Sequence, residues 1–233
     1  MRGILRLGAT LAGALALSAC ASTPPFDYSI WLQNPPRSIL VLPPIDNTIE
    51  PLACYGCLST VTQPLAERGF YVFPVAVVDA MMRENGLPTP NDMHSVPLAK
   101  LREIFAPDAV LYLTVSEWGT SYQVVSSVSS VAIAGRLVDA RTGTEIWRGQ
   151  HRLAQGSGGG GNLIGMLASA LVTQVARSVN DPSRQLSSVV SGEMFANPRN
   201  GLLPGPYHDG HEAALTAERD AMAARAAAAD GSP

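Results

Sequence analysis

Residues 137–147, Leu-Val-Asp-Ala-Arg-Thr-Gly-Thr-Glu-Ile-Trp, decide the fold class of this 233-residue chain. Within them, Ala140-Arg141-Thr142-Gly143 predicts a tight turn, with Gly143 at the position that requires a positive φ. A long run typical of a β-strand, 122–139, leads into the turn, and residues 144–153 lead back from it. The turn therefore predicts an antiparallel hairpin, and a purely parallel sheet is excluded.

Strands are also predicted upstream of the hairpin. The apolar run 38–42 ends at two prolines, which lack the backbone donor that a sheet needs, so it is typical of a buried strand. Residues 70–78 are rich in aromatic and β-branched side chains, which favour a second strand. Residues 109–118 predict a third strand, and 119–121 predict the turn that joins it to the run from 122.

Apolar residues at helical spacing predict helices between and after these strands. The segments are 55–68, 80–85, 97–105, 163–179 and 183–196, with a glycine-rich connector at 155–162. This order of elements predicts a single α/β domain with a mixed sheet flanked by helices. The alanine-rich end, 211–229, favours helix but has few side chains for a core, so we expect a marginal or disordered tail.

The composition excludes two broad classes of protein. Charged residues make up 15% of the chain and the formal net charge is −3. A disordered chain would carry more net charge and fewer apolar residues than the 46% found here. A nucleic-acid partner is not expected, because acidic residues outnumber basic ones.

The first twenty residues are typical of a secreted bacterial lipoprotein. Arg2 and Arg6 precede an uncharged apolar stretch, 7–19, that is too short for a permanent membrane span. The stretch ends in Leu17-Ser18-Ala19-Cys20, which resembles the bacterial lipobox. The resemblance implies cleavage before Cys20 and acylation of Cys20 with chains such as palmitate, which hold the protein on outer-membrane lipids. Ala21 in place of aspartate favours the outer membrane in the bacterial sorting rule.

Four segments follow from this organisation. Residues 1–19 are the predicted signal peptide, 20–37 a lipidated tether, 38–206 the folded domain and 207–233 a flexible tail. The tether holds four prolines, and its apolar patch of Phe26, Tyr28, Ile30 and Trp31 is able to dock on the domain.

Cys54 and Cys57 are the strongest candidates for chemistry. In an oxidising periplasm this spacing suits a structural disulfide bond or inert thiols, and a redox motif uses the same spacing. The preceding strand, however, ends twelve positions before Cys54. We find no further catalytic, cofactor or metal residues: the four histidines are scattered, and the glycines at 156–161 lack the lysine of a phosphate loop. Glu117, an acid within an apolar strand, is expected to face outward.

The domain over 38–206 resembles a family of bacterial lipoproteins typified by a meningococcal vaccine-candidate antigen. One matching motif is Asn200-Gly201-Leu202-Leu203-Pro204-Gly205-Pro206. The other matching stretches are 36–44, 58–62, 64–67, 71–78, 85–87, 112–115, 119–123 and 137–143. The Cys54/Cys57 pair and the alanine-rich tail depart from the family pattern.

The resemblance implies an outer-membrane lipoprotein without known catalysis. Genes of the family tend to neighbour CsgG-like secretion lipoproteins, and the fold is thought similar to the amino-terminal domain of TolB and to CsgG-like domains. We therefore expect a non-enzymatic, periplasm-facing accessory of a CsgG-like secretion or envelope-assembly complex, acting through protein contacts and able to form a homodimer. The alternatives are a periplasmic thiol–disulfide protein that uses Cys54 and Cys57, and a small-ligand carrier for a transporter.

Overall fold

A mixed sheet forms the centre of the computed structural model, which describes residues 26–122, 127–156 and 182–230. Its strands are β1 (Ser38–Val41), β2 (Ile45–Asp46), β3 (Tyr71–Val72), β4 (Ala109–Tyr122), β5 (Ser127–Asp139) and β6 (Glu145–Gly156). The order is β3-β1-β4-β5-β6, and β2 also pairs with β4. The β1–β3, β1–β4 and β2–β4 pairs are parallel, whereas β4, β5 and β6 form an antiparallel meander. The prediction of a mixed-sheet α/β domain is confirmed.

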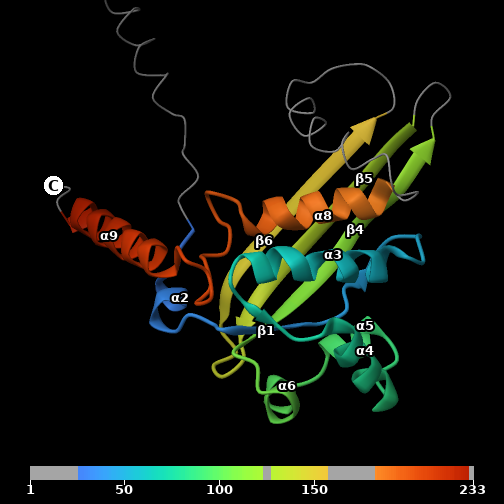
Figure 1. The fold of residues 1–233 in the computed structure, drawn as a ribbon, viewed down its shortest axis with the longest axis horizontal. Coiled ribbons are helices and arrows are strands. Elements are labelled where there is room, and N and C mark those ends of the chain that lie inside the picture. The colour runs from blue at the N-terminus through green and yellow to red at the C-terminus, as the bar shows by residue number, and fades with distance from the viewer. Residues whose placement is uncertain (1–25, 123–126, 157–181, 231–233) are drawn as a thin grey trace, which may run out of the picture.

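Helices cover both faces of the sheet to different extents. They are α2 (Ser29–Gln33), α3 (Ala53–Glu67), α4 (Val75–Glu84), α5 (Pro90–His94), α6 (Leu98–Phe105), α8 (Pro182–Phe195) and α9 (His211–Asp230). Figure 1 shows α3 and α8 side by side across the sheet, with α4, α5 and α6 grouped beyond β1. The α9 helix extends from the end of the domain that also carries α2.

Alternate residues of β1 and of the position that follows it enter two separate cores. Ile39 and Val41 join the core beneath α3 and α8, whereas Leu40 and Leu42 join the core with α4, α5 and α6. A strand buried on both faces needs apolar residues at consecutive positions, which explains why the run 38–42 does not alternate.

The hairpin that decides the fold class forms as expected. Gly143 has a φ of 74°, and its backbone N–H donates to the carbonyl of Asp139 at 2.9 Å. The carboxylate of Asp139 accepts the backbone N–H groups of Arg141 and Thr142 at 2.8 and 2.9 Å. Asp139 therefore stabilises the turn through its side chain, as Asp commonly does in tight turns.

The predicted strand over 70–78 is wrong beyond its first residues. Strand β3 ends at Val72, and α4 begins at Val75 directly after Pro74. Val78 and Met82, four residues apart, are the buried members of α4 and pack in the second core. The β-branched residues of this segment therefore cover the sheet from a helix, because tertiary burial outweighs their local strand preference.

The predicted turn at 119–121 is also wrong, because β4 continues through it to Tyr122. A register shift between Val115 and Glu117 marks a bulge in the pairing with β5. Gly119 has a φ of 113° and lies close to the side chain of Glu50. A bulge and a glycine can bend a strand without ending it.

Two other expectations concern the C-terminal half. The helix over 163–179 and most of the glycine-rich connector lie outside the described residues. The tail, expected to be marginal or disordered, forms α9, whose Leu215 is buried in the first core. Glu218 and Arg225 form an ion pair on the same helix. Leu215 thus packs α9 against the domain, and the ion pair links two turns of α9.

Candidate functional site

The segment that follows the predicted lipid anchor is built into the domain from Phe26 onward. Trp31 of α2 is completely buried, and its ring meets the edge of Phe70 with centroids 6.0 Å apart. The Tyr28 hydroxyl donates to the backbone carbonyl of Gly201. The expectation that this patch docks on the domain is confirmed for Tyr28 and Trp31, whereas Ile30 stays 41% exposed. Cys20 lies outside the described residues, so its acylation stays a prediction.

Cys54 and Cys57 lie in the first two turns of α3. Both are free thiols in this structure; Cys57 is fully buried and Cys54 nearly so. A position at the start of a helix suits a redox pair, because the helix dipole there favours a thiolate. The surroundings of the two thiols oppose this effect.

Burial is the main reason that both thiols hold their protons. It raises the pKa of Cys57 to about 12 and, together with the carboxylates of Asp46 and Asp79, raises the pKa of Cys54 to about 11. Thiol exchange requires the thiolate, which is scarce at neutral pH when the pKa is this high. The described site therefore disfavours nucleophilic thiol chemistry.

A polar cluster between α3 and α8 surrounds Cys57. The Ser187 hydroxyl hydrogen-bonds the Cys57 thiol and lies 2.7 Å from the hydroxyl of Thr60. Ser183, Ser187 and Ser191 recur every four residues on α8 and are all buried. Small side chains along one helix face let a neighbouring helix approach closely, so this stripe belongs to packing. The spacing of the serines was visible in the sequence, but their position opposite Cys57 was not.

Replacing Cys57 with serine should reduce the loss of stability at alkaline pH. A thiol whose pKa rises from 9 to about 12 on folding contributes stability below pH 9 that is lost as the pH rises toward 12. The wild-type protein should therefore lose up to about 1.4 kcal/mol per pH unit more than Cys57→Ser in that window. Urea unfolding of both proteins across this range measures the difference, and identical slopes would contradict the buried-thiol assignment.

The second face of the meander is polar and open beyond α4, α5 and α6. Arg136 stacks on the ring of Tyr112 with its guanidinium carbon 4.1 Å from the centroid. Arg152 pairs with Glu117 at 2.7 Å, so Glu117 faces outward as expected. Arg148 pairs with Glu145 at 2.8 Å. Each of these three arginines thus has an aromatic or acidic neighbour.

Two features are absent from the residues that the structure describes. No group of three or more His, Cys, Asp and Glu side chains there is arranged to hold a metal ion. Among the helices in the same parts of the chain, none is both long and apolar enough to cross a membrane.

A family model described as lipoprotein GNA1162-like matches residues 26–207, most of the chain. The chain belongs to the GNA1162-like lipoprotein family. The similarity to lipoprotein NMB1124/NMB1162 of Neisseria meningitidis serogroup B is 43% identity over 200 residues, which covers 84% of this chain and 93% of the relative. The expected family resemblance is confirmed.

Solved structures extend the comparison. The crystal structure of lipoprotein GNA1162 from Neisseria meningitidis superposes with a TM-score of 0.52 at 46% identity, covering 61% of this chain and all of the other. PelC from Paraburkholderia phytofirmans gives a TM-score of 0.40 at 15% identity over 74% of this chain and 91% of PelC. The GNA1162-like match ends at residue 207, so α9 lies beyond the matched residues.

Proposed function

We propose that this protein is an outer-membrane lipoprotein, held by acylated Cys20, that acts without catalysis through contacts with other envelope proteins. The observation that carries the proposal is the membership in a lipoprotein family, joined to a lipobox that ends six residues before the docked segment. Because Trp31 is buried in the domain core, the folded domain begins almost directly behind the anchor. A CsgG-like lipoprotein is the partner that we propose, in a secretion or envelope-assembly complex.

Exposed apolar side chains before and within the first turn of α3 support a role in protein contacts. Ile49 is 96% exposed, Leu52 71% and Tyr55 46%, and all three lie within seven residues of the chain. Large apolar side chains gathered at one place are typical of protein-interaction surfaces. The protonated thiols of Cys54 and Cys57 favour this function over the thiol–disulfide alternative, and the ligand-carrier alternative has no support from the described residues.

Changes at the lipobox test the anchor. The Cys20→Ala protein should lack the mass of the acyl chains, because no acylation site remains, and it should keep the leader, because the lipobox that directs cleavage is lost. The Ala21→Asp protein should keep its acyl chains but shift toward the inner membrane, with Ala21→Ser as the control that stays in the outer membrane. Intact-mass measurement and density-gradient fractionation report both changes. An acylated Cys20→Ala protein would contradict the assignment of the anchor.

Crosslinking in living cells tests the partner. A photoreactive amino acid at Leu52 should capture a CsgG-like lipoprotein, whereas the same amino acid at Lys100, exposed on α6, should not. Recovery of no envelope protein from either position would contradict the accessory role while leaving the anchor result unaffected.

A further inference from the structure

The end of the domain that carries α2 forms a rigid surface, here called the anchor end, made of α2, residues 201–208 and the start of α9. Tyr28 and Arg68 donate hydrogen bonds to the carbonyls of Gly201 and Leu202. The backbone N–H of Tyr207 donates to the carbonyl of Gly69 at 3.1 Å. At the start of α9, the His211 ring is 2.7 Å from the carbonyl of Pro204. Segments from both ends of the chain are thus held together.

We propose that the anchor end rests on the membrane and that Ile30 and Tyr207 contact the lipid surface there. The inference rests on the proposed acylation of Cys20. It adds the orientation of the domain and the side chains that meet lipid.

The length of the tether limits where the domain can lie. Cys20 precedes Phe26 by six residues, and six residues reach at most about 22 Å when fully extended. Phe26 is already part of the anchor end, since its ring packs edge-on against Tyr28 with centroids 4.8 Å apart. The anchor end therefore stays within about 22 Å of the acyl chains.

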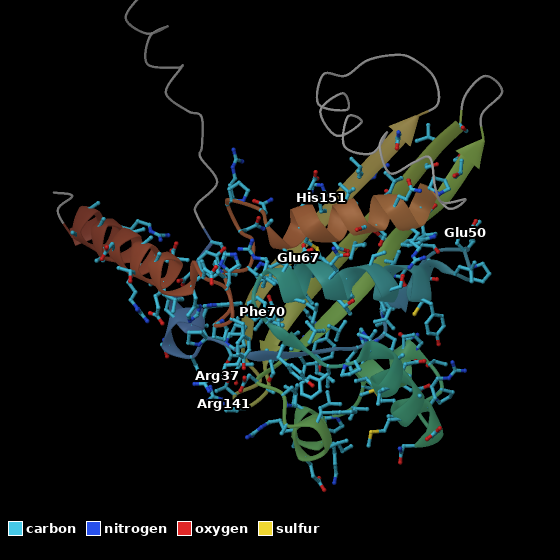
Figure 2. The ribbon with its side chains drawn as sticks, in the orientation of Figure 1. Arg37, Glu50, Glu67, Phe70, Arg141 and His151 are labelled. Atoms are coloured by element: carbon cyan, nitrogen blue, oxygen red, sulfur yellow. The ribbon has the colours of Figure 1, made fainter. Side chains whose placement is uncertain are left out.

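The opposite end of the domain lies farther away than the tether reaches. Asn34, just after α2, donates to Asp139 at 3.4 Å, and Asp139 pairs with Ala109 at the start of β4. Ten residues along β4, Gly119 lies beside Glu50, and ten strand residues span about 33 Å. Figure 2 shows Arg37 and Glu50 at opposite ends of the domain. If the domain stood on its opposite end, with Glu50 on the membrane, Phe26 would lie farther from the acyl chains than the tether can reach.

The exposed side chains of the anchor end suit a lipid surface. Tyr207 is 70% exposed and Ile30 is 41% exposed. Tyrosine prefers the boundary between lipid and water, and an aliphatic side chain gains free energy when it leaves water. Asp27 and Asp209 are also exposed at this end, so attraction to anionic lipid does not explain the contact. The contact is apolar, and neutral phosphatidylcholine is sufficient for it.

Spin labels on the lipidated full chain test the orientation. One variant, Gln33→Cys, carries the label at the end of α2, and a second, Ile49→Cys, carries it at the opposite end of the domain. The two labelled proteins are compared in phosphatidylcholine vesicles that carry a nickel-chelating lipid. Unsubstituted protein controls for reaction at the buried Cys54 and Cys57. The label at 33 should relax several-fold faster than the label at 49. Equal relaxation, or faster relaxation at 49, would overturn the orientation.

A second comparison tests the lipid contact itself. The double variant Ile30→Ser/Tyr207→Ser should lower the relaxation rate of the label at 33, because the anchor end no longer favours lipid. The control Leu52→Ser should leave this rate unchanged. No change in the double variant would overturn the contact assigned to these side chains. Acyl mass and vesicle association are measured first on each protein. A protein without acyl chains would instead overturn the proposed anchor.

Discussion

Replacing Trp147 with alanine is expected to lower the free energy of unfolding by about 3–5 kcal/mol. The side chain is fully buried, and its ring packs against Phe195 of α8 with centroids 5.6 Å apart. The indole N–H donates to the carbonyl of Asn200 at 2.6 Å. The substitution removes this donor and opens a cavity between the meander and α8, so it loses both packing and a hydrogen bond.

Urea unfolding followed by circular dichroism measures this loss on the chain from Ala21 onward, which lacks both the apolar leader and the acylation site and therefore needs no detergent. Trp118→Ala is the matched control, because Trp118 is only partly buried and should cost less. Trp147→Phe should recover part of the stability by refilling some of the cavity. A loss below about 1 kcal/mol for Trp147→Ala would show that the surrounding residues collapse into the space.

Replacing Gly69 with alanine should destabilise the protein much more than replacing Gly86. The two glycines have nearly equal φ values, 82° and 84°, so a side chain meets the same backbone strain of about 1–2 kcal/mol at each. A Cβ at Gly69 would lie 2.4 Å from the backbone nitrogen of His208, whereas a Cβ at Gly86 meets nothing within 4 Å. The clash adds about 1–3 kcal/mol to the loss of stability, and it does so only at Gly69.

The same substitution should loosen the anchor end. Gly205 and Tyr207 donate backbone hydrogen bonds to the carbonyls of Arg68 and Gly69 at 2.7 and 3.1 Å. Pushing His208 away from Gly69 should weaken both bonds, so amide exchange at Gly205 and Tyr207 should accelerate in Gly69→Ala but not in Gly86→Ala. Equal losses of stability in the two variants would leave only the shared backbone strain and would contradict the close contact.

Local patterns predicted those elements whose signal lies within a few residues. The turn at Gly143 and the buried run 38–42 follow from backbone and hydrogen-bonding rules that act over short distances. The segment 70–78 failed because its β-branched residues favour a strand locally, while Val78 and Met82 face a core that forms from distant segments. The same limit explains why the turn expected at Gly119 does not form. The glycine bends the strand locally, but pairing with β5 continues the strand beyond it.

For the cysteine pair of the candidate site, too, the sequence predicts one part and the tertiary structure decides the other. Its spacing is visible in the sequence, and spacing alone leaves redox chemistry and inert thiols open. The pKa values that disfavour a thiolate arise from burial beneath α8 and from Asp46 and Asp79, which lie on other elements. No pattern in the residues next to the two cysteines in the sequence predicts these surroundings.

The sequence by itself predicted the antiparallel hairpin and the membership in a lipoprotein family, because turn residues and family motifs can be recognised without the structure. The lipobox at Cys20 is also predicted from the sequence alone, and it stays a prediction. The tertiary structure decided which side chains meet across the chain. Gly135 and Gly149 pair across β5 and β6, and Gly149 leaves room for the indole of Trp147. Trp31 joins a tether-like segment to the core, and Gly69 receives residues 205–208. These contacts depend on surfaces that exist only after folding brings distant residues together.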